Sequence, residues 1–345
     1  MDGVTLIICC HNSSTKLPSV LTHLAAQEVP EDIPWEVIVV DNASTDDTSQ
    51  VALQVWPEDL PVPLKVIYEP ELGLMHARHR GLSEARYELV SFIDDDNWVA
   101  SNWVKVVFEV MSPRSTIGAC GGFGEEVCEV EPPWWFEKYK GDYAVGSQGP
   151  ETGDVTETRG YLWGAGLTVR KSVWQRLLRS GYRNLLTGRR GNSLTSGEDV
   201  ELCFAIRIAG FRLWYEPRLH LRHFLPPRRL TWRYLRLMYR GDGASSVGYD
   251  PYLAILGSEA QKHQEIWKRE FLKTSMKLFR FRARLGKSLL LSCEGDQQTL
   301  AIELAMGRLL ELFHKRQAYD NSFHAVRQLR NNLDAQGRDS QKPGK

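Results

Sequence analysis

The sequence predicts an α/β fold with a mostly parallel central sheet flanked by helices, followed by a C-terminal helical extension. Three observations support this prediction. Short apolar runs alternate with helical patterns through the first hundred residues, the loops between them are short, and helical patterns dominate after Leu230. Alternating strands and helices with short connections are typical of a parallel sheet with right-handed crossovers. With 345 residues, 42% of them hydrophobic, the chain can bury a sizeable core.

The first strand and helix carry the clearest patterns. Val4–Cys10 is a continuous apolar run of the length expected for a parallel strand that is covered on both faces. After a polar loop at residues 11–15, a helix is expected over about 16–26, because its leucine and valine side chains fall on one face. The elements expected next are a strand over 37–40, a helix capped by Ser44 or Thr45 that ends near Val55, a strand over 64–68, a helix after Gly73 and a strand from Val90.

The strand from Val90 runs directly into three consecutive carboxylates, Asp94–Asp96. Neighbouring carboxylates repel and raise each other's pKa unless a cation or hydrogen-bond donors share the site. A hard divalent cation, held by one or two carboxylates and a substrate's phosphate oxygens, can keep such a cluster ionised. A solvated turn after a strand is the alternative explanation.

Polar residues follow three strands of the predicted sheet. Cys10, Asp41 and the Asp94–Asp96 triplet all fall at carboxyl ends of strands, where parallel sheets bind ligands. A mononucleotide there needs acceptors for a base imide or ribose hydroxyls, which Asp41 and Asn42 supply. Arg78 supplies a cation for the diphosphate, and the triplet supplies a metal site. No G-x-G-x-x-G or P-loop motif follows the first strand, which disfavours dinucleotide and P-loop chemistry.

Residues 118–166 are rich in glycine and aromatic residues and show weak periodicity. Aromatic side chains offer a large contact area at low entropy cost, so they could line an acceptor or donor-sugar pocket. They could also simply close the edge of the sheet. The elements expected next are a strand over 167–169, a helix from Ser196 to Ile208 with Ser196 as its cap, and a strand over 211–215.

Five ordered blocks resemble family 2 glycosyltransferases of the GT-A fold. They are residues 4–12, 39–46, 73–81, 94–96 and 196–202, and the resemblance covers roughly residues 4–240. It implies inverting transfer of a sugar from a nucleotide-diphosphate donor, with Mn²⁺ or Mg²⁺ as cofactor and a D-x-D motif within the triplet. A UDP-sugar is the expected donor, and the expected acceptor is a hydroxyl on a glycan or lipid-linked glycan, in polysaccharide or glycoconjugate biosynthesis.

The resemblance also implies a role for individual residues. Asp96 and His223 are the expected metal ligands, with His220 as an alternative. Asp199 is the expected general base, and Glu198 is expected to orient the acceptor. By themselves, acidic residues in a first helical turn are ordinary complements of the helix dipole. The residues expected to bind the nucleotide sugar are Cys9, His11, Asn12, Asp41, Asn42, Arg78, Asp94, Asp95 and Trp163.

Two departures from the family pattern leave the nucleotide preference open. Cys9-Cys10-His11 stands where Pro-Thr or Thr-Tyr is usual, and His79 stands where Asn is common. The expected domains are a glycosyltransferase domain over 1–225, with a nucleotide-sugar half over about 1–122 and an acceptor half over about 123–225, a basic helical extension over 226–333 and a disordered tail over 334–345.

The zero formal net charge hides a basic segment. Residues 222–287 hold fifteen Lys and Arg against five Asp and Glu, a net charge of +10 (15 − 5). Helices are expected from Leu230, with a break at Gly241–Gly243, and then over about 258–290, 298–318 and 322–333. No RNP or helix-turn-helix pattern accompanies the charge, so nucleic acid is not the expected partner. The segment 226–290 is either a solvated helical face or a peripheral contact with anionic lipid.

The remaining composition favours a cytoplasmic protein, with peripheral attachment to the inner face of the membrane if the basic helices contact lipid. The six cysteines form no C-x-x-C pair, and we interpret them as small core residues of a protein in a reducing compartment. No apolar run approaches the length of about 18 residues that spans a bilayer. No segment with the charged and apolar pattern of a signal peptide is found before Val4.

Two other functions are alternatives to sugar transfer. A sugar-phosphate nucleotidyltransferase also uses paired Asp residues and a metal, but it normally needs a Gly-rich loop with a basic residue after the first strand. Residues 11–14 do not supply one. A non-catalytic sugar-binding or lipid-binding module is the second alternative, and the joint presence of Asp94, Asp96, Glu198 and Asp199 argues against it.

Overall fold

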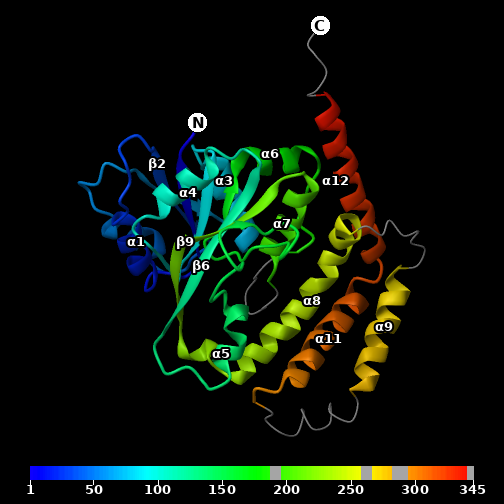
Figure 1. Cartoon of the computed structure of the whole chain (residues 1–345). Helices are drawn as coiled ribbons and strands as arrows, with labels where there is room; N and C mark the ends of the chain where they lie inside the picture. Colours follow the sequence, from blue (N-terminus) through cyan, green and yellow to red (C-terminus); the bar gives the residue numbers. More distant parts are fainter. Residues whose placement is uncertain (187–195, 258–265, 282–293, 340–345) are drawn as a thin grey trace. The chain divides into compact units, whose positions relative to one another are not determined.

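The computed structural model describes residues 1–186, 196–257, 266–281 and 294–339 (Figure 1). These residues form two compact units. The first comprises Met1–Glu131, Lys138–Gln175 and Gly210–Pro226, and the second comprises Pro132–Glu137, Arg176–Ala209 and Pro227–Lys345. The first unit therefore ends next to the domain boundary expected at residue 225, but it does not include the segment Arg176–Ala209.

The first unit is built on a mixed sheet. The described residues contribute nine strands to it. Eight of them follow the order β3-β2-β1-β4-β8-β6-β9-β5, and the ninth, β7, pairs with β9 outside this path. The strands are β1 (Val4–Cys10), β2 (Trp35–Asn42), β3 (Leu64–Glu69), β4 (Leu89–Asp94), β5 (Asn97–Val99), β6 (Ile117–Cys128), β7 (Gly153–Asp154), β8 (Thr168–Arg170) and β9 (Arg212–Leu225). β1 to β4 pair in parallel. Beyond β4 the sheet is mixed, because β8 is antiparallel to both β4 and β6.

The helices flank this sheet and form most of the second unit. In chain order they are α1 (Leu17–Ala25), α2 (Thr48–Val55), α3 (Leu74–Glu84), α4 (Trp103–Met111), α5 (Phe136–Tyr139), α6 (Lys171–Arg179), α7 (Glu198–Ile208), α8 (Trp232–Leu256), α9 (Ile266–Arg280), α11 (Gln297–His314) and α12 (Tyr319–Asp339), with 3-10 turns η1 (Lys140–Tyr143) and η2 (Pro227–Arg229). α1 and α2 begin after Lys16 and Asp47, and neither has a side-chain cap, so the predicted capping of α2 by Ser44 or Thr45 is wrong.

The core of the first unit lies on both faces of β1 and β2. No side chain from Leu6 to Ile8 or from Val37 to Val40 has exposed surface. Successive side chains of a strand point to opposite faces, so complete burial requires cover on both sides, as the unbroken apolar runs predict. α1 provides part of this cover with the predicted leucine and valine face, formed by Leu17, Val20, Leu21 and Leu24.

Glycines explain why β6 is not visible in the sequence pattern. This 12-residue strand lies in the segment of weak periodicity. A Cβ on Gly122 would lie 1.8 Å from the carbonyl oxygen of Leu219, and one on Gly124 would lie 2.1 Å from that of Ala144. Glycine is required where another backbone approaches a strand this closely, and it interrupts the apolar alternation that indicates a strand.

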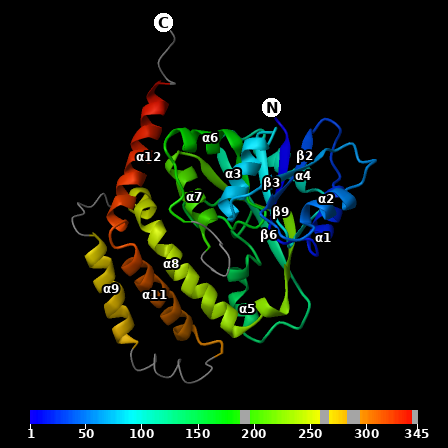
Figure 2. The ribbon, with the colours of Figure 1, turned by 180° about the vertical axis from the view of Figure 1, so that it is seen from behind.

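In the second unit, α8, α11 and α9 lie side by side in this order, as Figure 1 and the view from behind in Figure 2 both show. The predicted break at Gly241–Gly243 is wrong, because α8 continues through it. A Cβ on Gly243 would lie 2.0 Å from the carbonyl oxygen of Leu304 in α11, and one on Gly307 would lie 1.8 Å from that of Arg240 in α8. These glycines allow two helices to pack closely.

The C-terminal helices differ from their predicted bounds. Of the helix expected over 258–290, residues 266–280 form α9, and residues 258–265 and 282–293 lie outside the described residues. Residues 334–339, expected in a disordered tail, belong to α12, and residues 340–345 are not described. None of the helices formed by the described residues has the length and apolar character needed to cross a bilayer.

Candidate active site

The strand register brings the predicted nucleotide-binding residues to one edge of the sheet. β1 lies between β2 and β4, with Cys10 opposite Asp41 and Cys9 opposite Asp94. The pairing is parallel, so the carboxyl ends of the three strands meet at this edge, where ligands bind in such sheets.

The loops after β1 and β2 are joined by hydrogen bonds. The Asn12 Oδ1 accepts from the backbone N–H of Thr45 at 2.8 Å, and the Asn12 N–H donates to the Ser44 hydroxyl at 3.0 Å. Asn12 has a φ of 53°, in the left-handed region that Asn tolerates better than most residues. His11 donates from Nδ1 to the carbonyl oxygen of Asn42 at 2.8 Å. His11 and Asn12 thus lie exposed on one connected surface.

Asp41 and Asn42 are both buried and use their side chains differently. Asp41 accepts from the backbone N–H of Ser44 at 3.1 Å and from the Ser49 hydroxyl at 2.5 Å. The Asn42 amide donates to the carbonyl oxygens of Glu69 and Glu71 at 3.2 and 2.7 Å, and its oxygen accepts from the N–H of Gly73 at 2.7 Å. The Asn42 side chain therefore fixes the loop before α3.

Arg78 places a buried positive charge near the end of β1. Its guanidinium lies over the Phe92 ring, 5.1 Å from the centroid, within the range of a cation–π contact. Burial raises the pKa of the Cys9 thiol to about 12, and the positive charge of Arg78 offsets only part of this effect. Cys9 therefore remains a neutral thiol, which excludes it as a nucleophile at neutral pH.

Two carboxylates of the triplet, Asp95 and Asp96, have different partners. Asp95 accepts from the Ser13 hydroxyl at 2.5 Å and forms an ion pair with Lys16 at 3.1 Å. Asp96 lies instead beside His223 of β9, with 3.5 Å between Oδ1 and the imidazole Nε2. Asp94 is the last residue of β4. Ser13 and Lys16 compensate the Asp95 charge, which relieves the repulsion expected from three adjacent carboxylates.

The Asp96–His223 pair is the strongest candidate for metal binding. Both residues are buried, with 5% and 8% of their surface exposed. The His223 Nδ1 lies 2.7 Å from the carbonyl oxygen of Tyr143, which can only accept, so Nδ1 carries a proton. In the neutral ring Nε2 is then an acceptor directed at a carboxylate oxygen, an arrangement that a proton or a cation stabilises. The Asp96 Oδ1 also accepts from the Asn97 amide at 3.2 Å.

The donor set fits a hard divalent cation that also binds substrate. Among the described residues no group of three His, Cys, Asp or Glu side chains forms a metal-binding cluster. Mg²⁺ commonly takes one or two carboxylates and completes its shell with water and substrate phosphates, and imidazole is compatible with Mn²⁺.

His220 does not share this position. It lies three residues before His223 on β9, so its side chain points to the opposite face of the strand. Its Nε2 lies 3.1 Å from Glu125, and its ring stacks on Phe123 with 5.6 Å between centroids. The odd spacing of the two histidines is a sequence signal that distinguishes them.

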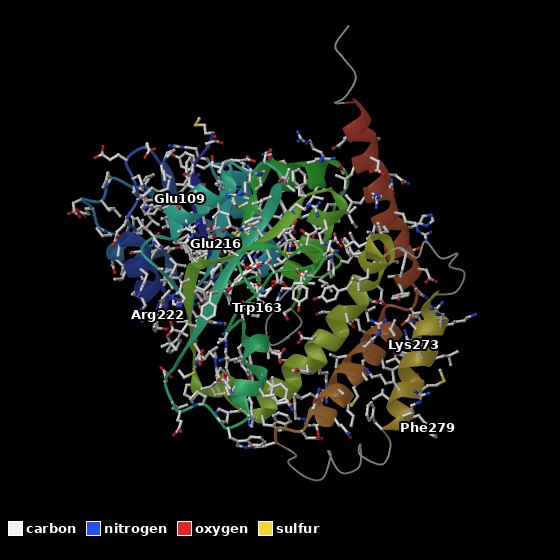
Figure 3. The ribbon with its side chains drawn as sticks, viewed as in Figure 1. Glu109, Trp163, Glu216, Arg222, Lys273 and Phe279 are labelled. Carbon is white, nitrogen blue, oxygen red and sulfur yellow. The ribbon has the colours of Figure 1, made fainter. Side chains whose placement is uncertain are left out.

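Trp163, labelled in Figure 3, lies in the loop before β8. Its backbone N–H donates to the Gln148 Oε1 at 2.7 Å, and Gln148 in turn donates to the carbonyl oxygen of Gly122 at 2.9 Å. The guanidinium of Arg159 lies over both Trp163 and Tyr161, at 4.6 and 4.8 Å from the ring centroids. No sequence pattern links Arg159 to the two rings, so its position could not be predicted.

Glu198 and Asp199 belong to the second unit and open α7. The residue at the N-cap is Gly197, with a φ of +105°, and α7 has no side-chain cap, so the predicted capping by Ser196 is wrong. Ser196 donates to Asp242 at 3.3 Å instead. Glu198 is buried and Asp199 is half-buried. Both carboxylates lie in the first turn, where the helix dipole favours negative charge.

Two groups near this helix start, the buried Glu201 and the half-buried Tyr249, were not identified from the sequence. Glu201 accepts from the backbone N–H groups of Leu185 and Leu186 at 2.7 and 3.0 Å and from the Tyr252 hydroxyl at 2.8 Å. Burial raises the pKa of Glu201 to about 7. The pKa of Tyr249 is raised by burial and then by the negative charge of Asp199, so Tyr249 keeps its proton.

The fold and the family match together define the class of protein. A sheet with a parallel N-terminal half and an acidic triplet at the end of β4 are features of GT-A type glycosyltransferases. Residues 5–176 match the family described as Glycosyl transferase family 2, and the chain belongs to this family. It is therefore a glycosyltransferase, which decides against a nucleotidyltransferase and against a non-catalytic module.

Individual relatives share part of the sequence. The succinoglycan biosynthesis protein ExoM of Rhizobium meliloti (strain 1021) is 24% identical over 227 residues, which cover 65% of this chain and 68% of ExoM. The uncharacterized glycosyltransferase Rv0539 of Mycobacterium tuberculosis (strain ATCC 25618 / H37Rv) is 34% identical over 110 residues, which cover 32% of this chain and 44% of the relative. The second match thus spans less than half of that relative.

Solved structures share the fold over nearly the whole chain. The mannosyltransferase PcManGT from Pyrobaculum calidifontis, in complex with GDP-Man and Mn²⁺, superposes with a TM-score of 0.54 at 20% identity, covering 98% of this chain and 88% of its own. S. aureus TarS 1-349, in complex with UDP-GlcNAc, gives a TM-score of 0.53 at 17% identity, with coverage of 99% and 93%. At these identities the likeness establishes the fold alone.

Proposed function

We propose that the protein is a metal-dependent, inverting glycosyltransferase that moves a sugar from a nucleotide-diphosphate donor to a hydroxyl of a glycan or lipid-linked glycan. The observation that carries the proposal is the Asp96–His223 pair. Tyr143 holds the His223 tautomer that leaves Nε2 as an acceptor facing a buried carboxylate. The pair belongs to the same unit as the strand ends that carry Asp41 and Asp94.

Asp96 and His223 would hold Mn²⁺ or Mg²⁺, which supplies charge neutralisation for the leaving nucleoside diphosphate. The donor set is one carboxylate and one neutral imidazole, and this set leaves room for phosphate oxygens as further ligands. The complexes of PcManGT with GDP-Man and Mn²⁺ and of TarS with UDP-GlcNAc support a nucleotide-sugar donor on this fold.

In this proposal the nucleotide lies against the loops that follow β1 and β2. Asp41 accepts from the base or ribose, His11, Asn12 and the neutral thiol of Cys9 line the pocket, and Asp94 faces the ribose. Two residues act indirectly. The side chain of Asn42 holds the neighbouring loop, and the buried charge of Arg78 favours the anionic diphosphate. A UDP-sugar is the proposed donor.

Trp163 is proposed to contact the donor sugar, and Asp95 to act on the site through the loop after β1. Flat aromatic rings give sugars a large apolar contact. The Arg159 guanidinium over the Trp163 ring and the Gln148 contact to the Trp163 backbone support a fixed orientation of this loop. The Ser13 and Lys16 contacts of Asp95 support its indirect role.

Asp199 is proposed as the general base. In a direct displacement the acceptor oxygen forms the new bond to the anomeric carbon while the bond to the diphosphate oxygen breaks, and the acceptor proton passes to a carboxylate. The half-buried Asp199 at the start of α7 can take this proton, and the buried Glu198 beside it is proposed to orient the acceptor. We place the reaction in the cytoplasm.

The experiment compares sugar transfer and donor hydrolysis from UDP-, GDP- and dTDP-sugars with Mn²⁺ present or chelated. Asp199→Asn should keep nucleotide binding within about twofold and lower turnover by about 10²-fold or more, the range typical of general base removal. Asp96→Ala should remove the stimulation by Mn²⁺. Asp154→Asn is the matched control, because this carboxylate lies on β7 and pairs with Arg212 at 3.5 Å.

Near-normal turnover of Asp199→Asn would contradict the assignment of the base. Equal stimulation of wild type and Asp96→Ala by Mn²⁺ would contradict the metal site. The two results are independent, because one variant is read by turnover at saturating metal and the other by the metal titration itself.

A further inference from the structure

One face of α9 is fixed against the helical core of the second unit. Trp267 and Phe271 pack against the buried cluster of Val247, Leu312, Tyr319 and Phe323. The Trp267 indole N–H donates to the carbonyl oxygen of Leu312 at 2.5 Å, and Thr274, one turn after Phe271, is buried. These contacts determine which side of α9 faces the neighbouring helices.

The opposite side of α9 carries three large apolar residues. Leu272, Met276 and Phe279 are 61%, 57% and 66% exposed. At about 100° per residue they fall within an arc of about 60°, and the centre of this arc lies about 130° around the helix from the midpoint of Trp267 and Phe271. Single exposed apolar residues are ordinary, but three aligned on one helix face usually mark a contact surface.

This apolar line is flanked by positive charge. α9 holds five cations against one carboxylate, a net charge of +4 (5 − 1): Lys268, Arg269, Lys273, Lys277 and Arg280 against Glu270. The Glu270 carboxylate lies 3.1 Å from Arg308 of α11 and 3.6 Å from Lys273. Figure 3 labels Lys273 and Phe279 on this helix, which lies at the outer side of the α8, α11 and α9 layer.

Two other cations of the basic segment bind a carboxylate inside the protein. Arg236 and Arg240 of α8 both bind the buried carboxylate of Glu303 in α11, with contacts of 2.6 and 2.5 Å. These arginines hold two helices together. Among the described helices of the basic segment, the combination of aligned exposed apolar side chains and flanking cations is thus a property of α9.

We propose that the face of α9 formed by Leu272, Met276, Phe279 and the flanking cations binds an anionic lipid bilayer. A helix with apolar residues on one side and Lys and Arg beside them lies in the plane of a membrane interface, its apolar side chains at the acyl boundary and its cations among the headgroups. The charge selects this occupant, because a second copy docked through the same face would place +4 against +4. The proposal is independent of the sugar-transfer reaction.

The test uses the full-length protein and vesicles of phosphatidylcholine, with or without about 30% phosphatidylserine, in co-sedimentation at low and high salt. Binding to the anionic vesicles should be at least about tenfold stronger than to neutral ones and should fall with salt. Met276→Ser with Phe279→Ser should weaken it about tenfold or more. Leu53→Ser is the matched apolar control, because Leu53 is 61% exposed on α2.

A charge variant provides a second readout that does not remove any apolar surface. Lys273→Gln with Lys277→Gln should weaken binding about tenfold or more and reduce its salt dependence, since each cation near an anionic surface contributes severalfold. Lys65→Gln with Lys105→Gln is the control, with both lysines half exposed in the first unit.

Protein that stays in the supernatant with anionic vesicles at low salt would overturn the proposal. So would binding that both α9 variants leave intact. A concentration-dependent dimer in light scattering that Phe279→Ser abolishes would also overturn it, because this face would then contact a second copy of the chain.

Discussion

Gly197 is a residue whose backbone and neighbours both require glycine. Its φ of +105° lies in the region that L side chains rarely adopt. A Cβ there would also lie 1.7 Å from the Tyr249 hydroxyl. The Tyr249 ring packs edge-on against Phe204, with 5.7 Å between centroids, which limits how far it can move. The turn that places Glu198 and Asp199 at the start of α7 therefore depends on a missing methyl group.

Gly197→Ala should lower the free energy of unfolding by about 2–4 kcal/mol, from backbone strain plus the clash with Tyr249. Gly181→Ala is the matched control, since Gly181 has a φ of +91° but its nearest side-chain atom lies 3.8 Å from the added Cβ. That variant should lose only about 1–2 kcal/mol. Urea unfolding measures both, and equal losses would contradict a role for the Tyr249 contact.

Glu201 should make stability depend on pH. Burial raises its pKa from 4.5 to about 7, so the folded protein keeps a proton that the unfolded chain releases. Between these pH values the folded state binds more protons, and the free energy of unfolding falls as pH rises. From pH 5 to pH 8 the free energy of unfolding should decrease by about 2 kcal/mol more in wild type than in Glu201→Gln. The Gln side chain resembles the neutral form of the Glu201 carboxyl group.

The measurement is urea unfolding of wild type and Glu201→Gln at several pH values. Glu311→Gln serves as a control, because Glu311 lies on α11 beside Lys315 at 3.1 Å and is not fully buried. Parallel pH profiles for wild type and Glu201→Gln would show that the carboxyl group is not the source of the dependence.

At the scale of elements, α8 and α11 are joined by close backbone packing. Gly243 and Gly307 each lie against a carbonyl oxygen of the partner helix. Arg236 and Arg240 of α8 reach Glu303 of α11 beside this contact. Sequence-based prediction places a helix break at glycine, because the conformational cost of glycine is a local property. The backbone against which each glycine packs lies about sixty residues away and leaves no signal in the local sequence.

Gly243→Ala should destabilise the protein by about 1–3 kcal/mol, because the added Cβ would lie 2.0 Å from the Leu304 carbonyl oxygen and the helices would have to separate. Gly337→Ala in α12 is the control, with its nearest side-chain atom 4.0 Å away. There the better helix propensity of Ala should stabilise the protein by about 0.5–1 kcal/mol. Chemical unfolding should therefore show a lower free energy of unfolding for Gly243→Ala and a higher one for Gly337→Ala than for wild type.

At the scale of the whole molecule, the charge is balanced in number and uneven in position. Lys and Arg match Asp and Glu at 43 each, yet residues 222–287 carry a net charge of +10 (15 − 5). Part of this charge holds α8 to α11, and part lies on the exposed side of α9. Net charge alone therefore says little about which surface meets an anionic partner.

The parallel half of the fold was predictable because its evidence is local. β1 and β2 are unbroken apolar runs, and their ends at Cys10 and Asp41 predicted a common edge, which the register confirms. The strand β6 and the unbroken α8 were not predictable, because their glycines are required by close contacts with backbone atoms that are distant in the sequence. Likewise, contacts such as Tyr143 to His223 join residues eighty positions apart, with no signal in either local sequence.

The hydrogen bond between His223 and Tyr143 has a consequence for the evolution of specificity. Tyr143 ends η1, and Ala144 follows it with a φ of 56°, so a tight backbone turn aims the carbonyl oxygen at the imidazole. This turn lies within residues 123–225, the half of the domain that is expected to bind the acceptor. Under the proposed function, a loop exchanged to accommodate a different acceptor would have to preserve the direction of this carbonyl group, because the carbonyl group holds the imidazole that would bind the metal.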